Sequence, residues 1–522
     1  MNGKNIVEGA YVEIYDGSLK AVNPATGLTL EGEFDKANES LVNEALQSAT
    51  KAFQSYRHLN KDLKADFLNA IADEITNIGE ELVTRASAES GLPLGRLQGE
   101  LGRTTGQLRL FANLVAEGSW VDAIIDTAIP ERQPLLRPDI RRMLVPIGPV
   151  VVFGASNFPL AFSVAGGDTA SALASGCPVI VKAHPAHYGT SALVGEAIIK
   201  AAEKTGMPKG VFSLLYDDGY TIGTALVKHP LTKAVTFTGS FKGGMALIHL
   251  AQQREHPIPV FAEMGSINPV IFLPEIIENQ AEELAKKYAA SITLGAGQFC
   301  TNPGLLLAVQ SPALDSFITF LKEAIAKIPS ATMLTEGIAH NYEQLSTEIV
   351  NENGVALLSA SSLKNDELQN QSQAKIAQVS ASHFINNPKL REEIFGPYSL
   401  LVVAQDMSEL EQAVDVLEGQ LTITIMAEKY ELQNHRNLID KLTDKTGRII
   451  FNGVPTGVEV CAAMQHGGPF PATNDSRFTS VGSTAIHRFA RPLAYQDWEQ
   501  ELLPDELKDG NPLGIFRTVN QK

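Results

Sequence analysis

The apolar positions in the first part of the chain follow the spacing of amphipathic helices. Between residues 39 and 84 they recur at steps of three and four, and Leu41, Ala45, Ala49 and Phe53 share one face. Side chains at these steps lie on one side of a helix, which predicts helices with a buried face. The preceding residues alternate short apolar pieces with turn signals, which predicts a hairpin or an extended lead-in.

The helical pattern continues over residues 87–111. It places Arg103, Gln107 and Leu110 on one face, because positions three and four apart stack on a helix. The pattern itself leaves Arg103 open: it could be a solvated arginine or a partner for Glu100.

From Val150 the rhythm changes to short apolar runs separated by helical stretches. The runs predict strands over residues 150–153, 179–181, 211–215, 234–237 and 259–261. The stretches between them predict helices over residues 163–175, 191–204, 222–228 and 244–253. Alternating strands and helices of this kind form a parallel sheet with crossover helices.

A second block with the same alternation begins near Ser266. Its predicted strands are residues 305–309, 398–403, 421–425 and 448–451. Its predicted helices are residues 278–294, 314–328, 410–417 and 432–442. This block predicts a second α/β domain, in which the polar tract 364–374 forms a surface loop. The proline-interrupted stretch 124–145 predicts edge strands.

Polar residues and a glycine come at the ends of the predicted strands of the first block. Asn157, Lys182, Gly239 and Glu263 lie just beyond an apolar run. Ligands of parallel α/β sheets bind at the carboxyl ends of the strands. The sequence therefore predicts a binding site at this edge of the sheet.

Cys300 lies between a glycine-rich approach and an Asn-Pro-Gly exit. Glycine permits a sharp, closely packed backbone, and proline stops a helix from running on. Such a loop presents its cysteine for reaction. The alternative is a packed thiol, since free cysteine is usually an inert small hydrophobe.

Four motifs identify the chain as a member of the aldehyde dehydrogenase superfamily, which it resembles over nearly its whole length. They occur in that family's order, at residues 156–159 (SNFP), 261–265 (FAEMG), 297–301 (GQFCT) and 392–397 (EEIFGP). The resemblance implies an α/β fold with a Rossmann-type cofactor domain, a second α/β catalytic domain and a small β oligomerisation element. The implied boundaries are 1–118 with 147–265 for the cofactor domain, 266–470 for the catalytic domain, and 119–146 with 485–505 for the oligomerisation element.

The resemblance also implies a reaction. The Cys300 thiolate adds to an aldehyde, the Asn157 amide and the Cys300 N–H stabilise the oxyanion, and Glu263 activates water for hydrolysis of the thioester. Burial is expected to raise the pKa of Glu263 towards the working range. Members that transfer the acyl group to coenzyme A or phosphate generally lack this base, so a free acid is the expected product. The alternatives are a turn role for Asn157 and a salt-bridged surface position for Glu263.

The cofactor prediction starts from the turn at residues 237–243. Its backbone N–H groups and the helix that follows suit a pyrophosphate. The implied cofactor-binding residues are Ser156, Lys182, Gly239, Ser240, Gly243, Glu393 and Phe395. Members that prefer NAD often carry a glutamate where this chain has Pro185. Lys182 and His184 could therefore accept a 2′-phosphate, although Asp217 and Asp218 oppose one; NADP is expected, and NAD is possible.

The substrate prediction rests on two stretches, residues 102–109 (GRTTGQLR) and 165–169 (AGGDT). They resemble members that oxidise 2-oxoglutarate semialdehyde (2,5-dioxopentanoate) and a bacterial member that acts on long-chain fatty aldehydes. In the family the helix that carries Arg103 lines the substrate tunnel. Arg103 and Phe158 are therefore expected to bind substrate, with the guanidinium holding the distal carboxylate of a short acidic aldehyde. One alternative substrate is a medium- or long-chain aliphatic aldehyde. A remote alternative is a catalytically silent member that serves as a structural or binding protein.

The composition limits the kinds of partner that this protein is expected to bind. A formal net charge of −17 argues against nucleic acid and anionic membranes. Three cysteines are too few for a disulfide framework and fit a reducing compartment. The N-terminus lacks the apolar core of a signal peptide, and no apolar run reaches the length of a membrane span, so the cytoplasm is expected. The resemblance implies a homodimer or a homotetramer. The pair His184 and His187 lacks an evident third ligand, so no metal site is predicted.

Overall fold

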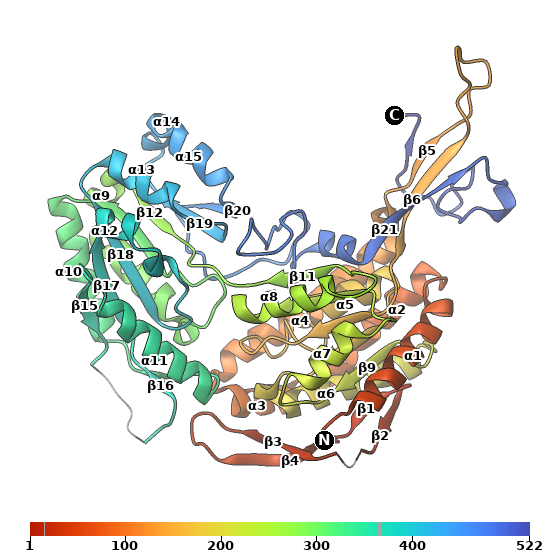
Figure 1. Cartoon of the computed structure of the whole chain (residues 1–522), viewed down its shortest axis with the longest axis horizontal. Helices are drawn as coiled ribbons and strands as arrows, with labels where there is room; N and C mark the ends of the chain where they lie inside the picture. The colour runs from red at the N-terminus through yellow and green to blue at the C-terminus, as the bar shows by residue number, and fades with distance from the viewer. Residues whose placement is uncertain (15, 363–366, 522) are drawn as a thin grey trace.

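The computed structural model describes residues 1–14, 16–362 and 367–521. Within them the chain forms two seven-stranded sheets, one four-stranded sheet and two strand pairs. The two large sheets lie in separate lobes (Figure 1). The polar tract 364–374 lies partly outside the described residues, and its described end forms strand β16 (Gln371–Ser372) against β14 (Ala331–Thr332).

The first large sheet carries the predicted βα alternation. Five of its strands are parallel, and the N-terminal hairpin adds two antiparallel strands at one edge. In spatial order the strands are β11 (Val260–Glu263), β10 (Ala234–Thr238), β7 (Val150–Phe153), β8 (Val179–Lys182), β9 (Phe212–Leu215), β1 (Asn5–Val7) and β2 (Ala10–Val12).

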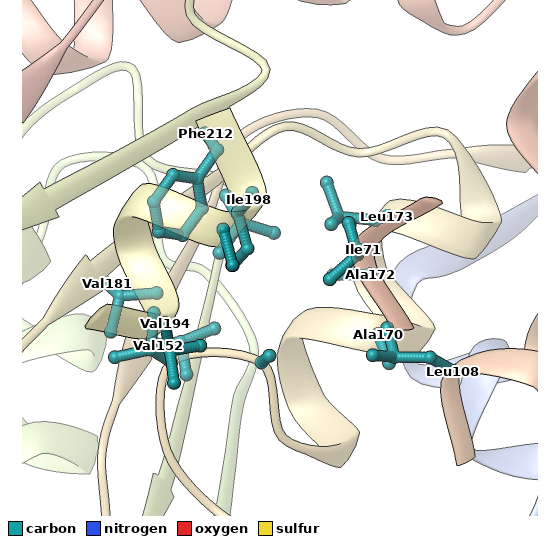
Figure 2. Close-up of a cluster of buried hydrophobic side chains, with 14 of the residues drawn as sticks. Ile71, Leu108, Val152, Ala170, Ala172, Leu173, Val181, Val194, Ile198 and Phe212 are labelled. Carbon is teal, nitrogen blue, oxygen red and sulfur yellow. The ribbon is translucent and has the colours of Figure 1, made fainter. Parts of the chain in front are cut away.

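Helices cover both faces of this sheet because its central strands are apolar on both sides. Val150 and Val152 pack into one buried cluster, whereas Val151 packs into the cluster on the opposite face. The first face is covered by α2 (Lys61–Asn77), α4 (Leu94–Glu117), α5 (Gly167–Ser175) and α6 (Tyr188–Lys204), and Figure 2 shows part of this cluster. The second is covered by α1 (Glu39–Tyr56), α7 (Thr221–Lys228) and α8 (Phe241–Gln252). Helix α3 (Gly79–Ser90) packs beside α4 and α6.

The second large sheet is parallel except for one edge strand. Its order is β15 (Ala356–Ala360), β17 (Lys375–Ser380), β18 (Tyr398–Ala404), β13 (Leu305–Val309), β12 (Val270–Phe272), β19 (Gln420–Met426) and β20 (Thr446–Phe451). One face packs on α9 (Pro274–Thr293) and α10 (Pro312–Ala326). The other packs on α11 (Glu336–Val350), α12 (Ala381–Asn386), α13 (Met407–Asp415) and α15 (Arg436–Thr443), with the short α14 (Glu431–Asn434) before α15.

A third sheet forms an arm that projects from the first lobe (Figure 1). Its order is β21 (Ala490–Gln496), β6 (Ile140–Pro146), β5 (Ile124–Asp126) and β22 (Thr518–Val519). The stretch predicted to form edge strands therefore pairs with the C-terminal part of the chain. The hairpin β3 (Ser18–Val22) and β4 (Thr29–Asp35) lies across the bottom of the first lobe (Figure 1).

The chain returns from the second lobe to the first after β20. This return segment, residues 452–489, is mostly irregular and crosses between the two large sheets (Figure 1). It bonds to the end of β11, where Met264 N donates to Ala472 O at 2.8 Å and Glu263 forms a bridge with Thr473. No helix in the described residues has both the length and the apolar composition of a membrane span.

Candidate active site

Cys300 follows a tight left-handed stretch of backbone. Gly295, Ala296 and Gly297 have φ angles of 57°, 57° and 64°, which residues other than glycine adopt at a cost. A Cβ on Gly297 would lie 2.2 Å from the Gly396 carbonyl oxygen, so only glycine fits there. The glycine-rich approach thus turns the chain sharply and packs it against the second lobe before the cysteine.

A buried asparagine that the sequence did not single out holds this loop from behind. The Asn268 side-chain amide donates to the carbonyl oxygens of Cys300 and Asn302, both at 2.9 Å. Its carbonyl oxygen accepts from Thr422 Oγ1 at 3.0 Å. Asn268 is fully buried with a φ of 45°, a conformation that asparagine tolerates better than most residues. It therefore fixes the cysteine backbone to the second sheet.

Asn157, just beyond β7, reaches the same loop from the first sheet. Its Nδ2 donates to the Gln298 carbonyl oxygen at 3.0 Å, two residues before Cys300. This bond uses one of the two N–H groups of the amide and leaves the other for a ligand. The structure thus brings Asn157 and the cysteine loop together across the two lobes, as the motifs predicted.

Glu263 is the last residue of β11 and is 4% exposed. Ser480 Oγ, on the return segment, donates to its Oε2 at 2.8 Å. The same carboxylate lies with the Cys300 thiol, because a sulfur and a carboxylate oxygen of the two residues are within 4.8 Å of each other. Glu263 is therefore a buried carboxylate beside the cysteine, and the surface alternative is wrong.

His466 completes this group and was missed by the sequence analysis. Its Nε2 lies 3.5 Å from Cys300 Sγ and 3.2 Å from Glu263 Oε1, and the side chain is 1% exposed. Its backbone N–H donates to Thr479 Oγ1 at 2.8 Å, which anchors it within the return segment. A single histidine with no motif around it gives no usable signal; only the fold brings it to the cysteine.

The charges in this group differ from those expected. Burial alone raises the pKa of Glu263, but the attraction of His466 and the hydrogen bonds from His466 and Ser480 outweigh it, so the pKa is lowered. The predicted upward shift is therefore wrong, because it took no account of His466. Burial, together with the Glu263 charge, raises the pKa of the Cys300 thiol well above its usual value, while Arg103 opposes the shift. The resting group is a thiol beside a carboxylate, so its reaction needs a base.

Arg103 points into an aromatic cluster beside the cysteine. Its Cζ lies 5.7 Å and 5.1 Å from the ring centroids of Phe158 and Phe162. Its Nε and Nη2 are buried with no hydrogen-bond partner among the described residues. Burial lowers the pKa of the Arg103 guanidinium, and the nearby Cys300 and Glu100 oppose that shift. The solvated alternative is therefore wrong, and the unpaired N–H groups fit an anionic ligand.

A second arginine joins this cluster without having been predicted. Arg96, about two turns before Arg103 on α4, lies 4.9 Å and 4.7 Å from the ring centroids of Phe158 and Phe299. Its Nη2 donates to the Asn157 carbonyl oxygen at 2.7 Å. Arg96 therefore connects α4 to Asn157, which lies just beyond β7.

The residues expected to hold an adenosine ribose lie at the ends of β8 and β9. Lys182 Nζ donates to the Asp217 carbonyl oxygen at 2.8 Å. Asp218 is paired with Lys36, whose Nζ lies 2.6 Å from its Oδ1, so its charge is offset. Burial lowers the pKa of His184 well below its usual value, with His187 adding to the effect. His184 is therefore neutral and adds no charge for a 2′-phosphate. The expectation that His184 attracts this phosphate is wrong, whereas Lys182 keeps that role in the prediction.

The turn between β10 and α8 already uses two of its N–H groups. Gly239 N donates to Glu263 O at 3.0 Å, and Gly243 N donates to Ser240 Oγ at 3.2 Å, so Ser240 caps the helix. The N–H groups of Phe241 and Lys242 have no partner inside the helix. The helix N-terminus therefore still offers donors to a phosphate. Ser156 is half-buried beyond β7.

Glu393 lies between the lobes beside Gly265. A Cβ on Gly265 would meet Glu393 Oε2 at 2.4 Å, so the glycine makes room for the carboxylate. Ser266 N donates to Oε1 at 3.5 Å, a long bond. Burial raises the pKa of Glu393 to about 7. A carboxylate with free acceptor atoms fits the hydroxyls of a ribose, while Phe395 packs partly buried against the apolar cluster around Leu334.

The match to known families decides the classification. The model of the aldehyde dehydrogenase family matches residues 11–470. This chain belongs to the aldehyde dehydrogenase family.

Two relatives match the aldehyde dehydrogenase chain along its whole length. It is 50% identical over 523 residues to alpha-ketoglutaric semialdehyde dehydrogenase 2 of Azospirillum brasilense, covering 100% of this chain and 99% of that protein. It is 48% identical over 520 residues to alpha-ketoglutaric semialdehyde dehydrogenase of Acinetobacter baylyi, covering 99% of this chain and 98% of that protein.

A solved structure shares the fold at low identity. The 1-pyrroline-5-carboxylate dehydrogenase from Thermus with bound NAD aligns with a TM-score of 0.79 and 20% identity, covering 95% of this chain and 92% of that one. The predicted α/β fold and the predicted enzyme class are confirmed: the protein is an aldehyde dehydrogenase, and its family uses NAD or NADP.

Proposed function

We propose that this enzyme oxidises 2-oxoglutarate semialdehyde to 2-oxoglutarate, releasing the free acid. The names of the two full-length relatives support this substrate. The observation that carries the proposal is the buried guanidinium of Arg103, with unpaired N–H groups, near the Cys300 thiol. A short aldehyde with a distal carboxylate satisfies both groups at once, because its two ends carry the matching chemistry.

The first step is activation of the thiol. With its own proton on Nδ1, neutral His466 accepts the Cys300 proton at Nε2, 3.5 Å from the sulfur. The resulting imidazolium then donates from Nε2 to Glu263 Oε1, 3.2 Å away. The positive ring lies beside both the sulfur and the carboxylate. Its charge lowers the cost of forming a thiolate near Glu263.

The thiolate then attacks the aldehyde carbon to form a thiohemiacetal. Its oxyanion accepts from the free N–H of Asn157 Nδ2 and from the Cys300 backbone N–H. Asn268 holds the Cys300 carbonyl and so restrains the cysteine backbone as charge develops. Arg96 holds the Asn157 carbonyl in the same way.

The cofactor supplies an acceptor for the hydride that the thiohemiacetal carbon releases. Glu393 would hold the ribose next to the nicotinamide, with Phe395 beside the ring. Lys182 would hold the adenosine ribose, and the N-terminus of α8, with Gly239, Ser240 and Gly243, would face the pyrophosphate. Ser156 lies at the same edge, beyond β7.

Hydrolysis of the thioester completes the cycle. Glu263, held by Ser480, removes a proton from water, and the hydroxyl adds to the acyl carbon while the sulfur leaves as Cys300 thiolate. The carboxylate is ionised at neutral pH because its pKa is lowered, so it is in the form that a general base requires.

We assign NADP as the preferred cofactor, with NAD also accepted. Lys182 brings a positive charge to the ribose site, Pro185 brings no acid, and Lys36 offsets Asp218. Titration of both cofactors into the enzyme tests this assignment: the account expects tighter binding of NADP, and tighter binding of NAD would contradict it.

We also assign a homo-oligomer, a dimer or a tetramer, built through the arm. Large apolar side chains are exposed there, and an arm that stays in water would leave them hydrated. They are Leu135 (74% exposed), Leu136 (59%), Ile140 (37%), Trp498 (49%), Leu502 (69%) and Phe516 (75%).

The substrate proposal is tested with the variant Arg103→Leu. Loss of the guanidinium should raise the KM for 2-oxoglutarate semialdehyde by about 10- to 100-fold, because a charged hydrogen-bonded contact contributes about 1.5–3 kcal/mol. The KM for hexanal should stay within about threefold, since hexanal has no carboxylate.

Arg109→Leu is the matched control. Arg109 lies on the same helix but pairs with Asp73 at 2.8 Å on the surface. It should leave both KM values unchanged. Equal losses for the two aldehydes in Arg103→Leu would reject the carboxylate role and favour the aliphatic alternative, for which the phenylalanine rings of the cluster would be the binding wall.

A further inference from the structure

Three different ligand atoms of the active site converge on one point. His466 Nε2 lies 3.5 Å from Cys300 Sγ and 3.2 Å from Glu263 Oε1, and all three atoms are within 4.8 Å of one another. Thiolate, imidazole and carboxylate are the side chains that bind zinc in proteins. Catalysis by a nucleophile and one base needs only two of these groups in contact. The position of the third ligand atom beside them allows the group to bind a metal ion.

The spacing matches a tetrahedral zinc site. With Zn–S near 2.3 Å and Zn–N or Zn–O near 2.1 Å, ligand atoms at the corners of a tetrahedron lie roughly 3.4–3.6 Å apart. The sulfur-to-nitrogen distance of 3.5 Å falls within this range, and the nitrogen-to-oxygen distance of 3.2 Å falls 0.2 Å short of it. A cation could therefore bind with small side-chain adjustments.

Burial and charge favour a dication at this point. Glu263 is 4% exposed, and its Oε1 faces His466 Nε2 at 3.2 Å. A buried carboxylate carries a desolvation cost that a metal ion would offset. A thiolate, a carboxylate and a neutral imidazole around Zn²⁺ have no net charge, which suits a buried position. Cys300 keeps partial exposure, so an ion can enter from solvent.

We propose that Glu263, Cys300 and His466 form a zinc site with one open coordination position, and that Zn²⁺ bound there reversibly inhibits the enzyme. Formation of the Zn–S bond releases the thiol proton to solvent. The sulfur lone pair, the carboxylate and Nε2 are then all held by the metal. Nucleophile and bases are blocked together until a chelator removes the ion.

The ligand set selects among metals. Sulfur and imidazole donors suit Zn²⁺ and Cd²⁺, whereas Mg²⁺ and Ca²⁺ prefer oxygen ligands alone. Inhibition by micromolar zinc that is insensitive to millimolar magnesium is therefore expected, and equal effects of the two metals would overturn the proposal.

Binding is measured first, without turnover. Protein without a histidine tag is titrated with ZnCl₂ in competition with a chromophoric chelator, and one tight site per chain is expected. Glu263→Gln, Cys300→Ser and His466→Gln should each weaken this site by at least about 100-fold, because each removes a ligand. Cys461→Ser, which alters a cysteine outside the cluster, should bind as the wild type does. Unchanged binding in the three variants, or loss in Cys461→Ser, would overturn the proposal.

A second measurement needs no variant. Zinc should protect Cys300 of the wild-type protein from alkylation by iodoacetamide, as mapped by mass spectrometry, and EDTA should restore its reactivity. Alkylation of Cys300 at the same rate with and without zinc would reject the site. Both readouts are independent of aldehyde oxidation, so failure of the zinc proposal is distinguishable from failure of the proposed function.

Discussion

At the scale of single residues, His466 is expected to determine how the partly buried Cys300 can react. A thiol whose pKa is raised by burial and by a neighbouring carboxylate does not ionise unaided at neutral pH. His466 lies within reach of both groups, and once it has taken up the thiol proton its positive charge stands beside both of them. The nucleophile of this enzyme is therefore expected to depend on a histidine as well as on a glutamate.

Replacing this histidine tests that dependence. His466→Gln keeps a hydrogen-bonding side chain but cannot take up a proton, so kcat/KM should fall by about 100- to 10,000-fold, the usual range for a general base. The rate of Cys300 alkylation by iodoacetamide should fall as well, because the thiolate is the reacting form.

The control for this change is His256→Gln, an exposed position outside the site. It should leave both rates unchanged. If His466→Gln retained wild-type alkylation and turnover, thiol activation by His466 would be ruled out.

Glu393 predicts a pH dependence of cofactor binding. Its pKa is raised to about 7, so the carboxyl is neutral below that pH and ionised above it. The ionised form accepts hydrogen bonds from ribose hydroxyls, and binding should therefore tighten as pH rises, by about tenfold from about pH 6 to about pH 8. NAD is the suitable ligand because it lacks a titrating 2′-phosphate, and isothermal titration calorimetry measures its affinity.

Glu393→Gln provides the comparison. This variant has no ionisable group at the position, so the pH step should disappear while weaker binding remains. A variant that kept the full step would show that another group titrates.

The candidate catalytic residues could be predicted from the sequence where they belong to a recognisable motif. The sequence pointed to Cys300, Glu263 and Asn157, and the fold gathers them from two sheets. The protonation of Glu263 was not predictable, because its pKa depends on His466, more than two hundred residues away in the chain. Asn268 was missed for the same reason: its importance comes from a carbonyl that only the folded loop presents.

At the scale of elements, the local pattern of apolar residues was sufficient to predict the long helices and the strongly apolar strands. The five predicted strands of the first sheet form within two residues of their predicted limits. Strand β12 was missed because three apolar residues are too few to stand out. Helix α11 was missed because it buries little of its surface, and α5 starts later than predicted because Gly166 is extended.

The cysteine loop is the element on which the site depends most. Gly297 has a φ of 64°, and a Cβ there would lie 2.2 Å from Gly396 O. Gly297→Ala should therefore destabilise the protein by about 2–4 kcal/mol and abolish most activity, since strain and overlap add. Thermal unfolding and turnover measure the two effects.

Gly99→Ala is the matched control, because it lies on the exposed side of α4 with no atom within 4 Å of its Cβ. It should leave the melting temperature unchanged or slightly raised, since alanine favours a helix. A Gly297→Ala protein with wild-type stability and activity would show that the tight loop is dispensable.

At the scale of the whole molecule, the candidate site is formed by residues from both lobes and from the return segment between them. The candidate site gathers Asn157 and Glu263 from the ends of first-sheet strands, Cys300 from the second lobe and His466 from the return segment that connects them. The resemblance predicted the lobes, but the contribution of the return segment had no pattern in the sequence. It depends on the path by which an irregular segment crosses back to β11.

Substitutions in the arm test the proposed oligomeric state. Light scattering after gel filtration should give a dimer or a tetramer for the wild type. Leu135→Asp with Leu136→Asp places charges among exposed apolar side chains of the arm and should shift the protein to smaller species. Leu28→Asp, at an exposed leucine of the β3–β4 hairpin, should not. A monomeric wild type would contradict this assignment.

The central claim is that Cys300 carries the acyl group and Glu263 removes it. Glu263→Gln is mixed with 2-oxoglutarate semialdehyde and NADP, and the intact protein is weighed by mass spectrometry, with Cys300→Ser as the control. One 2-oxoglutaryl group should replace the thiol hydrogen of Cys300 and persist, while Cys300→Ser should gain nothing. An adduct on another residue, or none while reduced cofactor still accumulates, would contradict it.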